Sequence, residues 1–208
     1  MTAAQAILDE AFAVPADPDR IRRAAAALRE RDFAVHIVDR VADARRLVRE
    51  LLPRDKEIFT ALSETLRLSG IAADIEESGE FRSLRDRLEE LADDPVAKIK
   101  VGAAPDVVVG SVHAVTETGQ LVVASASGSQ LAPYAAGARQ AVWVVGAQKV
   151  VADLDTALRR IRTYSLPMEA ERVRATGWES FIGKILILER ELFPDRGTVV
   201  LIQEPIGF

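Results

Sequence analysis

The residues best suited to chemistry lie just past the middle of the chain, in the stretch VTETGQLVVASASGSQ at 115–130. Glu117 stands two residues before Gly119, and an apolar run then leads into a small-residue loop with Ser127 and Gly128. A carboxylate in such a place can act as a nucleophile or general base when a cavity and backbone donors lie nearby. The same Glu-X-Gly spacing is typical of an ordinary turn between two strands. Both interpretations stay open at this stage.

The loop that follows the apolar run is suited to holding an anion. Ser127 and Gly128 are small enough for the backbone to approach a ligand, and successive N–H groups can form a nest for phosphate or carboxylate. Open α/β sheets bind their ligands at the carboxyl ends of strands, where this loop is expected. The stretch matches neither the P-loop nor the G-x-G-x-x-G pattern, and a plain loop is the alternative.

Two further places carry candidate polar groups. Thr60 and Ser63 lie where a predicted strand passes into a helix, and a helix N-terminus favours anions, although capping by Ser63 alone explains that serine equally well. His113 precedes Glu117 by four residues. On a regular strand the two side chains would share a face, with a proton donor near the carboxylate. A lone histidine on a strand is otherwise structural.

The composition excludes several function classes. The chain has no cysteine, which rules out disulfides, iron–sulfur clusters, cysteine zinc sites and a thiol nucleophile, and two histidines do not make a metal site. The 27 basic and 32 acidic residues give a net charge of −5, which argues against nucleic acid as a partner. The arginine clusters at 20–23 and 159–162 are interpreted as solvated helix faces.

The N-terminal segment MTAAQAILDEAFAVPADPDR does not resemble a targeting signal. It lacks a basic region followed by an uninterrupted apolar stretch, and no apolar run in the chain approaches the ~18 residues that a bilayer requires. We therefore expect no membrane span and a cytoplasmic location.

Helical and strand patterns alternate in the first half of the chain, whereas the second half is rich in short Val, Ile and Leu runs. This order predicts an α/β fold with a mostly parallel sheet, flanking helices and an antiparallel hairpin insert, preceded by an N-terminal helical extension over 1–32. The predicted helices are one capped by Asp17, then 39–51, 63–69 with Gly70 at its end, one from Ser78 to Leu91, and 153–164. The predicted strands are 33–37, 57–61, DVVVGSVHAV, LVVASA, AVWVVG, KILILER and TVVLIQE.

The order of three segments resembles the LUD domain family, the family of the lactate utilization protein C. These segments are FTALSETLRLSGI at 59–71, VVVGSVHAVTETGQLVVASASG at 107–128, and AVWVVGAQKVVADLDTALRRI at 141–161. The resemblance implies a Rossmann-like sheet similar to that of sugar-phosphate isomerases and CoA transferases, with the LUD-type domain over 33–208. It also implies an association with bacterial oxidation of L-lactate to pyruvate, alongside iron–sulfur proteins.

The resemblance implies a nucleophilic role for Glu117. One departure from the family removes any metal or cluster role that depends on cysteines. In CoA transferases, a glutamate followed at two residues by glycine attacks an acyl thioester, which is the spacing of Glu117 and Gly119. Some relatives carry cysteines after the long C-terminal helix, whereas residues 175–184 have none. No cluster or metal role attached to those cysteines therefore transfers to this chain.

Three functional hypotheses follow, and whether the protein is an enzyme stays open. The first is a protein that binds a carboxylate, phosphate or acyl-CoA at the sheet edge, with acyl chemistry at Glu117, a proton donor at His113, and ligand contacts from Thr60, Ser63, Gly119, Ser127 and Gly128. The second is a non-catalytic accessory subunit that docks onto iron–sulfur partners. The third is a metabolite-sensing module that uses the same pocket.

Overall fold

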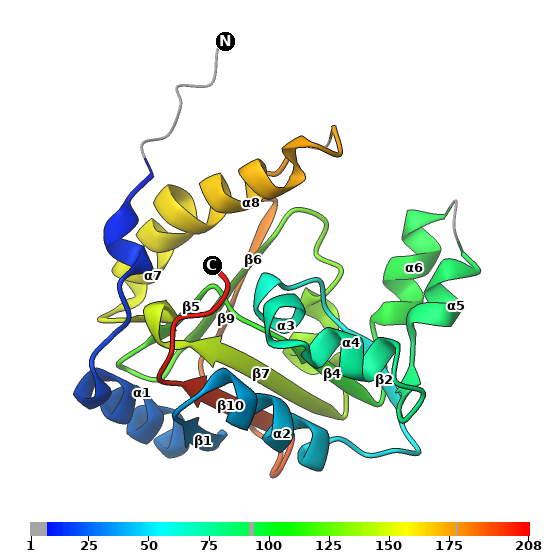
Figure 1. The fold of residues 1–208 in the computed structure, drawn as a ribbon, viewed down its shortest axis with the longest axis horizontal. Helices are drawn as coiled ribbons and strands as arrows, with labels where there is room; N and C mark the ends of the chain where they lie inside the picture. The colour runs from blue at the N-terminus through cyan, green and yellow to red at the C-terminus, as the bar shows by residue number, and fades with distance from the viewer. Residues whose placement is uncertain (1–7, 92–93, 178) are drawn as a thin grey trace.

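Six parallel strands form the main sheet, and Figure 1 shows helices packed against it. The computed structural model describes residues 8–91, 94–177 and 179–208. The strands lie in the order β1-β10-β7-β4-β2-β3, and every neighbouring pair is parallel. Their bounds are β1 Ala34–Val38, β2 Glu57–Thr60, β3 Arg82–Ser83, β4 Val107–Gly110, β7 Gln140–Gly146 and β10 Gly197–Ile202.

Both faces of the main sheet are buried, which is why its central strands are continuous apolar runs. In β7, Trp143 and Val145 belong to the hydrophobic cluster on one face, and Val142 and Val144 belong to the cluster on the other. Helix α1 (Pro18–Glu30) covers the first face. Its N-terminus forms as predicted, because the Asp17 carboxylate accepts a hydrogen bond from the Arg20 N–H.

The other helices complete the layers around the sheet. Helices α2, α3 and α4 bury their apolar residues in the cluster on the second face. Helices α5 and α6 lie beyond the β2–β3 edge of the sheet (Figure 1). The bounds are α2 Val41–Leu51, α3 Glu64–Ser69, α4 Ile71–Glu76, α5 Arg85–Glu89, α6 Pro95–Gly102, α7 Leu154–Arg160 and α8 Leu166–Arg174, with short helical segments η1 Glu10–Ala13, η2 Pro133–Gly137, η3 Ala147–Lys149 and η4 Ile161–Ser165.

A second, four-stranded sheet contains the predicted hairpin. It has the order β8-β5-β6-β9, in which β5 pairs antiparallel with β6 and parallel with β8. Helix α7, with η4, packs on this sheet in a third hydrophobic cluster. The bounds are β5 Ala114–Thr116, β6 Leu121–Ser125, β8 Val150–Val151 and β9 Lys184–Leu188. The predicted α/β fold with an antiparallel insert is confirmed.

The predicted helix from Ser78 to Leu91 is wrong. The Ser78 hydroxyl donates to the carbonyl of Asp74, and Gly79 has a φ of 74°, so the chain turns here. Strand β3 then pairs with β2, and α5 begins only at Arg85.

The predicted single strand DVVVGSVHAV is also wrong. Strand β4 ends at Gly110 in the main sheet, and β5 begins at Ala114 in the small sheet. A Cβ at Gly110 would lie 1.6 Å from the Tyr134 hydroxyl oxygen, so the ring packs directly on the backbone where the chain leaves the main sheet. His113 therefore lies between two strands rather than on a strand shared with Glu117.

The N-terminal segment is integrated into the core. Residues 1–7 of the predicted extension lie outside the described residues, whereas Ile21 and Leu28 of α1 belong to the main hydrophobic cluster. Among the described residues, no helix has both the length and the apolar character needed to cross a membrane.

Candidate functional site

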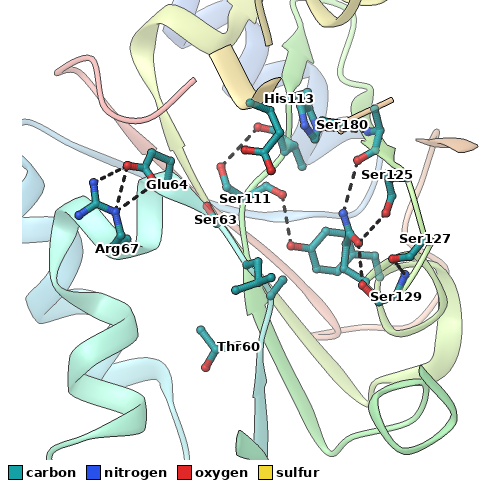
Figure 2. A pocket seen from close by; sticks show the side chains of 18 of the residues that line it. Thr60, Ser63, Glu64, Arg67, Ser111, His113, Ser125, Ser127, Ser129 and Ser180 are labelled. Atoms are coloured by element: carbon teal, nitrogen blue, oxygen red, sulfur yellow. Dashed lines mark hydrogen bonds and ion pairs between the residues drawn. The ribbon is translucent and has the colours of Figure 1, made fainter. Parts of the chain in front are cut away.

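A cavity of about 720 Å³ opens at the carboxyl edge of the main sheet. It is lined by the segments that follow β2 and β4, by the loop after β6, and by residues of α8. In Figure 2, Ser125, Ser127 and Ser129 lie to one side of Ser111, and the Glu64–Arg67 pair lies to the other. The position and the volume are those of a small-molecule site in an open α/β sheet.

Lys149 is the most unusual residue of the cavity. It follows β7, and only 2% of its surface is exposed. Its Nζ donates to the hydroxyl oxygens of Thr65 and Ser111, at 2.9 and 3.1 Å. Within the described ranges, no ion pair includes Lys149. Burial lowers the pKa of its ammonium group well below the usual value, and the charge of Arg160 acts in the same direction.

Arg160 is a second buried cation beside the cavity. Its Nη1 donates to the carbonyl of His113 at 2.6 Å and to the Ser165 hydroxyl at 2.8 Å, and its Nε donates to the carbonyl of Gln148 at 3.3 Å. Its Nη2 has no hydrogen-bond partner among the described residues. Burial lowers the pKa of the guanidinium to about 10, although Arg160 keeps its proton at neutral pH.

His113 lines the cavity as a neutral imidazole. Burial, together with the charges of Lys149 and Arg160, lowers its pKa to about 3. Its Nδ1 accepts the backbone N–H of Ala124 at 3.1 Å. The single proton of the neutral ring therefore lies on Nε2, which is left to donate to a ligand.

Thr60 and Ser63, which the sequence suggests as ligand contacts, both line the cavity. Ser63 caps α3, since its hydroxyl accepts the Leu66 N–H at 3.4 Å. The Oγ1 of Thr60 is buried and finds no hydrogen-bond partner in the part of the chain that the structure describes. A buried hydroxyl without a partner is costly, so Thr60 is a candidate contact for a polar ligand.

The serine loop contributes side chains rather than a nest of free N–H groups. Ser127 and Ser129 line the cavity, whereas Gly128 does not. The Gly128 N–H donates to the Ser125 hydroxyl at 2.9 Å, and the Ser129 N–H donates to the Ser127 hydroxyl at 3.3 Å. The loop therefore satisfies its own backbone and presents hydroxyl groups to the cavity.

Glu117 and Gly119 lie away from the cavity, in the turn of the β5–β6 hairpin. The carboxylate of Glu117 accepts hydrogen bonds from Arg20 at 2.6 Å and from Arg23 at 2.7 Å, both on α1. Burial raises the pKa of Glu117, but the two arginines outweigh burial and hold it below the usual value. The E-T-G turn thus fastens the hairpin to α1, and Glu117 is not brought near His113 or the serine loop.

Most of the other charged side chains around the cavity are paired with one another. Three ion pairs line it: Glu64 with Arg67, Glu76 with Arg85, and Glu169 with Arg172. Within the described ranges, no cluster of three or more histidine, cysteine or acidic residues is arranged to hold a metal ion. Lys149 in the lining and Arg160 beside His113 are therefore basic groups without an acidic partner among the described residues.

Sequence reasoning missed both of these cations. Lys149 stands between the runs VVGAQ and VVAD, and a single charge inside predicted buried strands was the available signal. Arg160 was interpreted as part of a solvated helix face, which is wrong because it is fully buried. Its neighbour Arg159 is exposed, so the residue type alone did not distinguish them.

Comparison with known proteins gives one family and one solved structure. The LUD domain model matches residues 21–202. The crystal structure of a DUF162 family protein from Deinococcus radiodurans aligns with a TM-score of 0.56 at 12% sequence identity, over 88% of this chain and 96% of that one. At that identity the alignment supports the α/β fold alone. A search of curated proteins gave no match. Because the family model spans most of the chain, including every strand of the main sheet, this protein belongs to the LUD domain family.

Proposed function

We propose that this LUD domain protein binds a small organic anion, a 2-hydroxy or 2-oxo acid, in the cavity at the carboxyl edge of the sheet. The observation that carries the proposal is that two buried basic side chains, Lys149 in the cavity lining and Arg160 beside the lining residue His113, have no carboxylate partner among the described residues. A ligand carboxylate would supply the missing negative charge. The family link to lactate utilization makes 2-hydroxy and 2-oxo acids the first class to test.

The hydroxyl groups of the cavity suit the remainder of such a ligand. Ser111, Ser127 and Thr60 offer donors and acceptors, and neutral His113 offers an Nε2–H donor. A 2-hydroxy or 2-oxo oxygen beside a carboxylate needs such groups, because a buried polar atom without a partner is costly. No chemistry is assigned to Glu117, which is paired with two arginines outside the cavity.

The test compares charged ligands with their uncharged amides. Sodium L-lactate and sodium pyruvate should raise the melting temperature, whereas lactamide and pyruvamide should not. At 100 times the dissociation constant, the gain in unfolding free energy is about 2.7 kcal/mol. Titration calorimetry measures the affinity directly.

Two matched lysine variants locate the site. Lys149→Met keeps the length of the side chain and removes the amine, so it should abolish the shift. Lys56→Met makes the same chemical change at an exposed position outside the cavity and should bind like the unaltered protein. Equal shifts in both variants, or no shift with any acid, would refute anion binding at this cavity.

A docking role is the second candidate, because two large apolar side chains at the cavity are exposed. Leu62 is 85% exposed and Phe181 is 59% exposed. Apolar groups of this size often mark a protein contact. An iron–sulfur partner should co-purify with the unaltered protein and be lost in the double variant Leu62→Ser with Phe181→Ser. Equal recovery of the partner with both proteins would exclude this face as the contact.

A further inference from the structure

We propose that Lys149 forms a covalent imine with the carbonyl carbon of a 2-oxo acid held in the cavity. The inference rests on the proposed function and deepens it, because it separates 2-oxo acids from 2-hydroxy acids. Its basis is geometric. Lys149 places its amine at the base of the cavity, held by two neutral hydroxyls and by no carboxylate within the described ranges.

The surroundings of Lys149 favour the neutral, nucleophilic amine. An ammonium group on a solvated lysine is almost fully protonated at neutral pH, whereas burial and the charge of Arg160 lower the pKa of Lys149. The other titratable group packed against it, His113, is neutral and adds no negative charge that would restore the proton. The hydroxyls of Thr65 and Ser111 fix the position of Nζ without neutralising it.

The reaction balances without any further reactant. The Nζ lone pair attacks the carbonyl carbon, an N–C bond forms, and the C=O π pair moves to the oxygen, which takes up a proton. The nitrogen then loses a proton, the hydroxyl leaves with a proton as water, and a C=N bond remains. The oxygen takes up the proton that the attacking nitrogen loses, and the Nε2–H of His113 is the available hydrogen-bond donor to that oxygen, because Nδ1 already accepts the Ala124 N–H. Arg160, whose Nη1 donates to the carbonyl of His113, adds a positive charge beside this lining residue.

Reductive trapping tests the imine directly. The full-length protein is incubated with pyruvate and sodium cyanoborohydride, and the adduct is placed by peptide mass spectrometry. The chain has only five lysines, Lys56, Lys98, Lys100, Lys149 and Lys184, so each is resolved in one experiment. Lys98 lines the same cavity but is half-buried, which makes it an internal control.

The expected result is trapping at Lys149 at least about ten-fold faster than at Lys98 or Lys56, since each unit by which a pKa falls raises the neutral fraction ten-fold. The rate at Lys149 should level off at a lower pH than the rates at the exposed lysines. L-lactate, which has no carbonyl group, should give no adduct. Lys149→Met should remove the fast adduct, and the comparison among lysines of the unaltered protein holds even if that variant folds poorly.

The outcomes separate the imine from the binding site. If pyruvate raises the melting temperature but forms no adduct at Lys149, the imine proposal is overturned and the proposal of anion binding stands. Equal trapping at all five lysines would also overturn the imine proposal. If pyruvate and L-lactate give no thermal shift and no adduct, both proposals are overturned.

Discussion

Burial of a lysine side chain lowers the stability of a fold, and the chemical environment of Lys149 indicates a functional reason for its burial. Removing an ammonium group from water costs several kcal/mol unless a counter-ion replaces the solvent. Lys149 has two hydroxyl partners instead, and the positive charge of Arg160 lowers its pKa further. Ionisable groups with strongly shifted pKa values gather at functional sites. These features support the proposal that the cavity binds a negatively charged ligand.

Binding of L-lactate should be coupled to proton uptake by Lys149. In the free protein the pKa of Lys149 is lowered, and a carboxylate beside the amine raises it again. Between these two pKa values the complex holds more protons than the free protein, so affinity should fall as the pH rises. Calorimetry in two buffers of different ionisation enthalpy measures the uptake. Lys149→Met should remove it, and identical heats in both buffers would contradict it.

Glu117 should behave as a structural residue. Glu117→Gln removes the charge that Arg20 and Arg23 share, and partly exposed ion pairs of this kind contribute about 1 kcal/mol. The folded-state pKa is lowered from 4.5, so the stabilisation is present above that pH and disappears as the pH falls through the folded pKa. Urea unfolding at several pH values measures the difference.

A matched change at an exposed carboxylate completes the Glu117 experiment. Glu90→Gln, on the exposed end of α5, should leave the unfolding free energy within about 0.5 kcal/mol. If Glu117→Gln also leaves the unfolding free energy unchanged, the contact between the hairpin and α1 contributes no stability. If it abolishes pyruvate binding with the fold intact, Glu117 has a role at the cavity.

At the scale of elements, the hairpin turn and α1 are fitted to each other. Gly119 has a φ of 87°, and a Cβ there would lie 2.7 Å from the backbone of Ala27 in α1. The glycine that the sequence placed in a ligand site is thus required by helix packing. Glu117 and Gly119 act together, one by charge and the other by close approach.

Gly119→Ala should destabilise the fold more than Gly79→Ala. Both glycines have positive φ, but nothing lies within 4 Å of a Cβ at Gly79, so only backbone strain applies there. At Gly119 the collision with α1 adds about 1–3 kcal/mol. Chemical denaturation of the two variants measures the difference. Equal losses would show that α1 moves aside without cost.

At the scale of the whole molecule, burial is uneven between the centre of the main sheet and the helix α5 beyond its β2–β3 edge. Every residue of β10 and all but one of β7 are buried. By contrast, none of the residues of α5, all of which the structure describes, is buried. The cavity lies between these regions, and its lining includes side chains from α5 as well as the rigid strand ends.

Amide hydrogen exchange should reproduce this gradient. Amides of β7 and β10 should exchange only through global unfolding, whereas those of α5 should exchange through local opening at lower free energy. Mass spectrometry of protected peptides measures both. Addition of pyruvate should slow exchange around the cavity, in the segments after β2 and β4. Uniform exchange across the chain would contradict the gradient.

The sequence by itself determined the layers of the fold and part of the site. Val-rich runs separated by helical patterns predict a buried parallel sheet, because period and composition follow directly from which faces are covered. Thr60, Ser63, His113 and Ser127 were named as candidates from the sequence, and all four line the cavity, although His113 was expected on a strand and lies between two strands. Helix caps, turns and strand ends depend on residues that are close together in the sequence, so the sequence alone can indicate them.

Only the tertiary structure decided which charges are buried and what they meet. Glu117 is paired because α1, about a hundred positions earlier in the chain, packs against the hairpin turn. Lys149 has no ion pair within the described ranges because its neighbours, Ser111 after β4 and Thr65 in α3, carry hydroxyls rather than carboxylates. Arg159 and Arg160 are adjacent and identical in type, yet Arg159 is exposed and Arg160 is fully buried, with hydrogen bonds to the carbonyls of Gln148 and His113. The pKa of a group depends on its surroundings in space, so the chemistry of this site became visible only once distant segments were brought together.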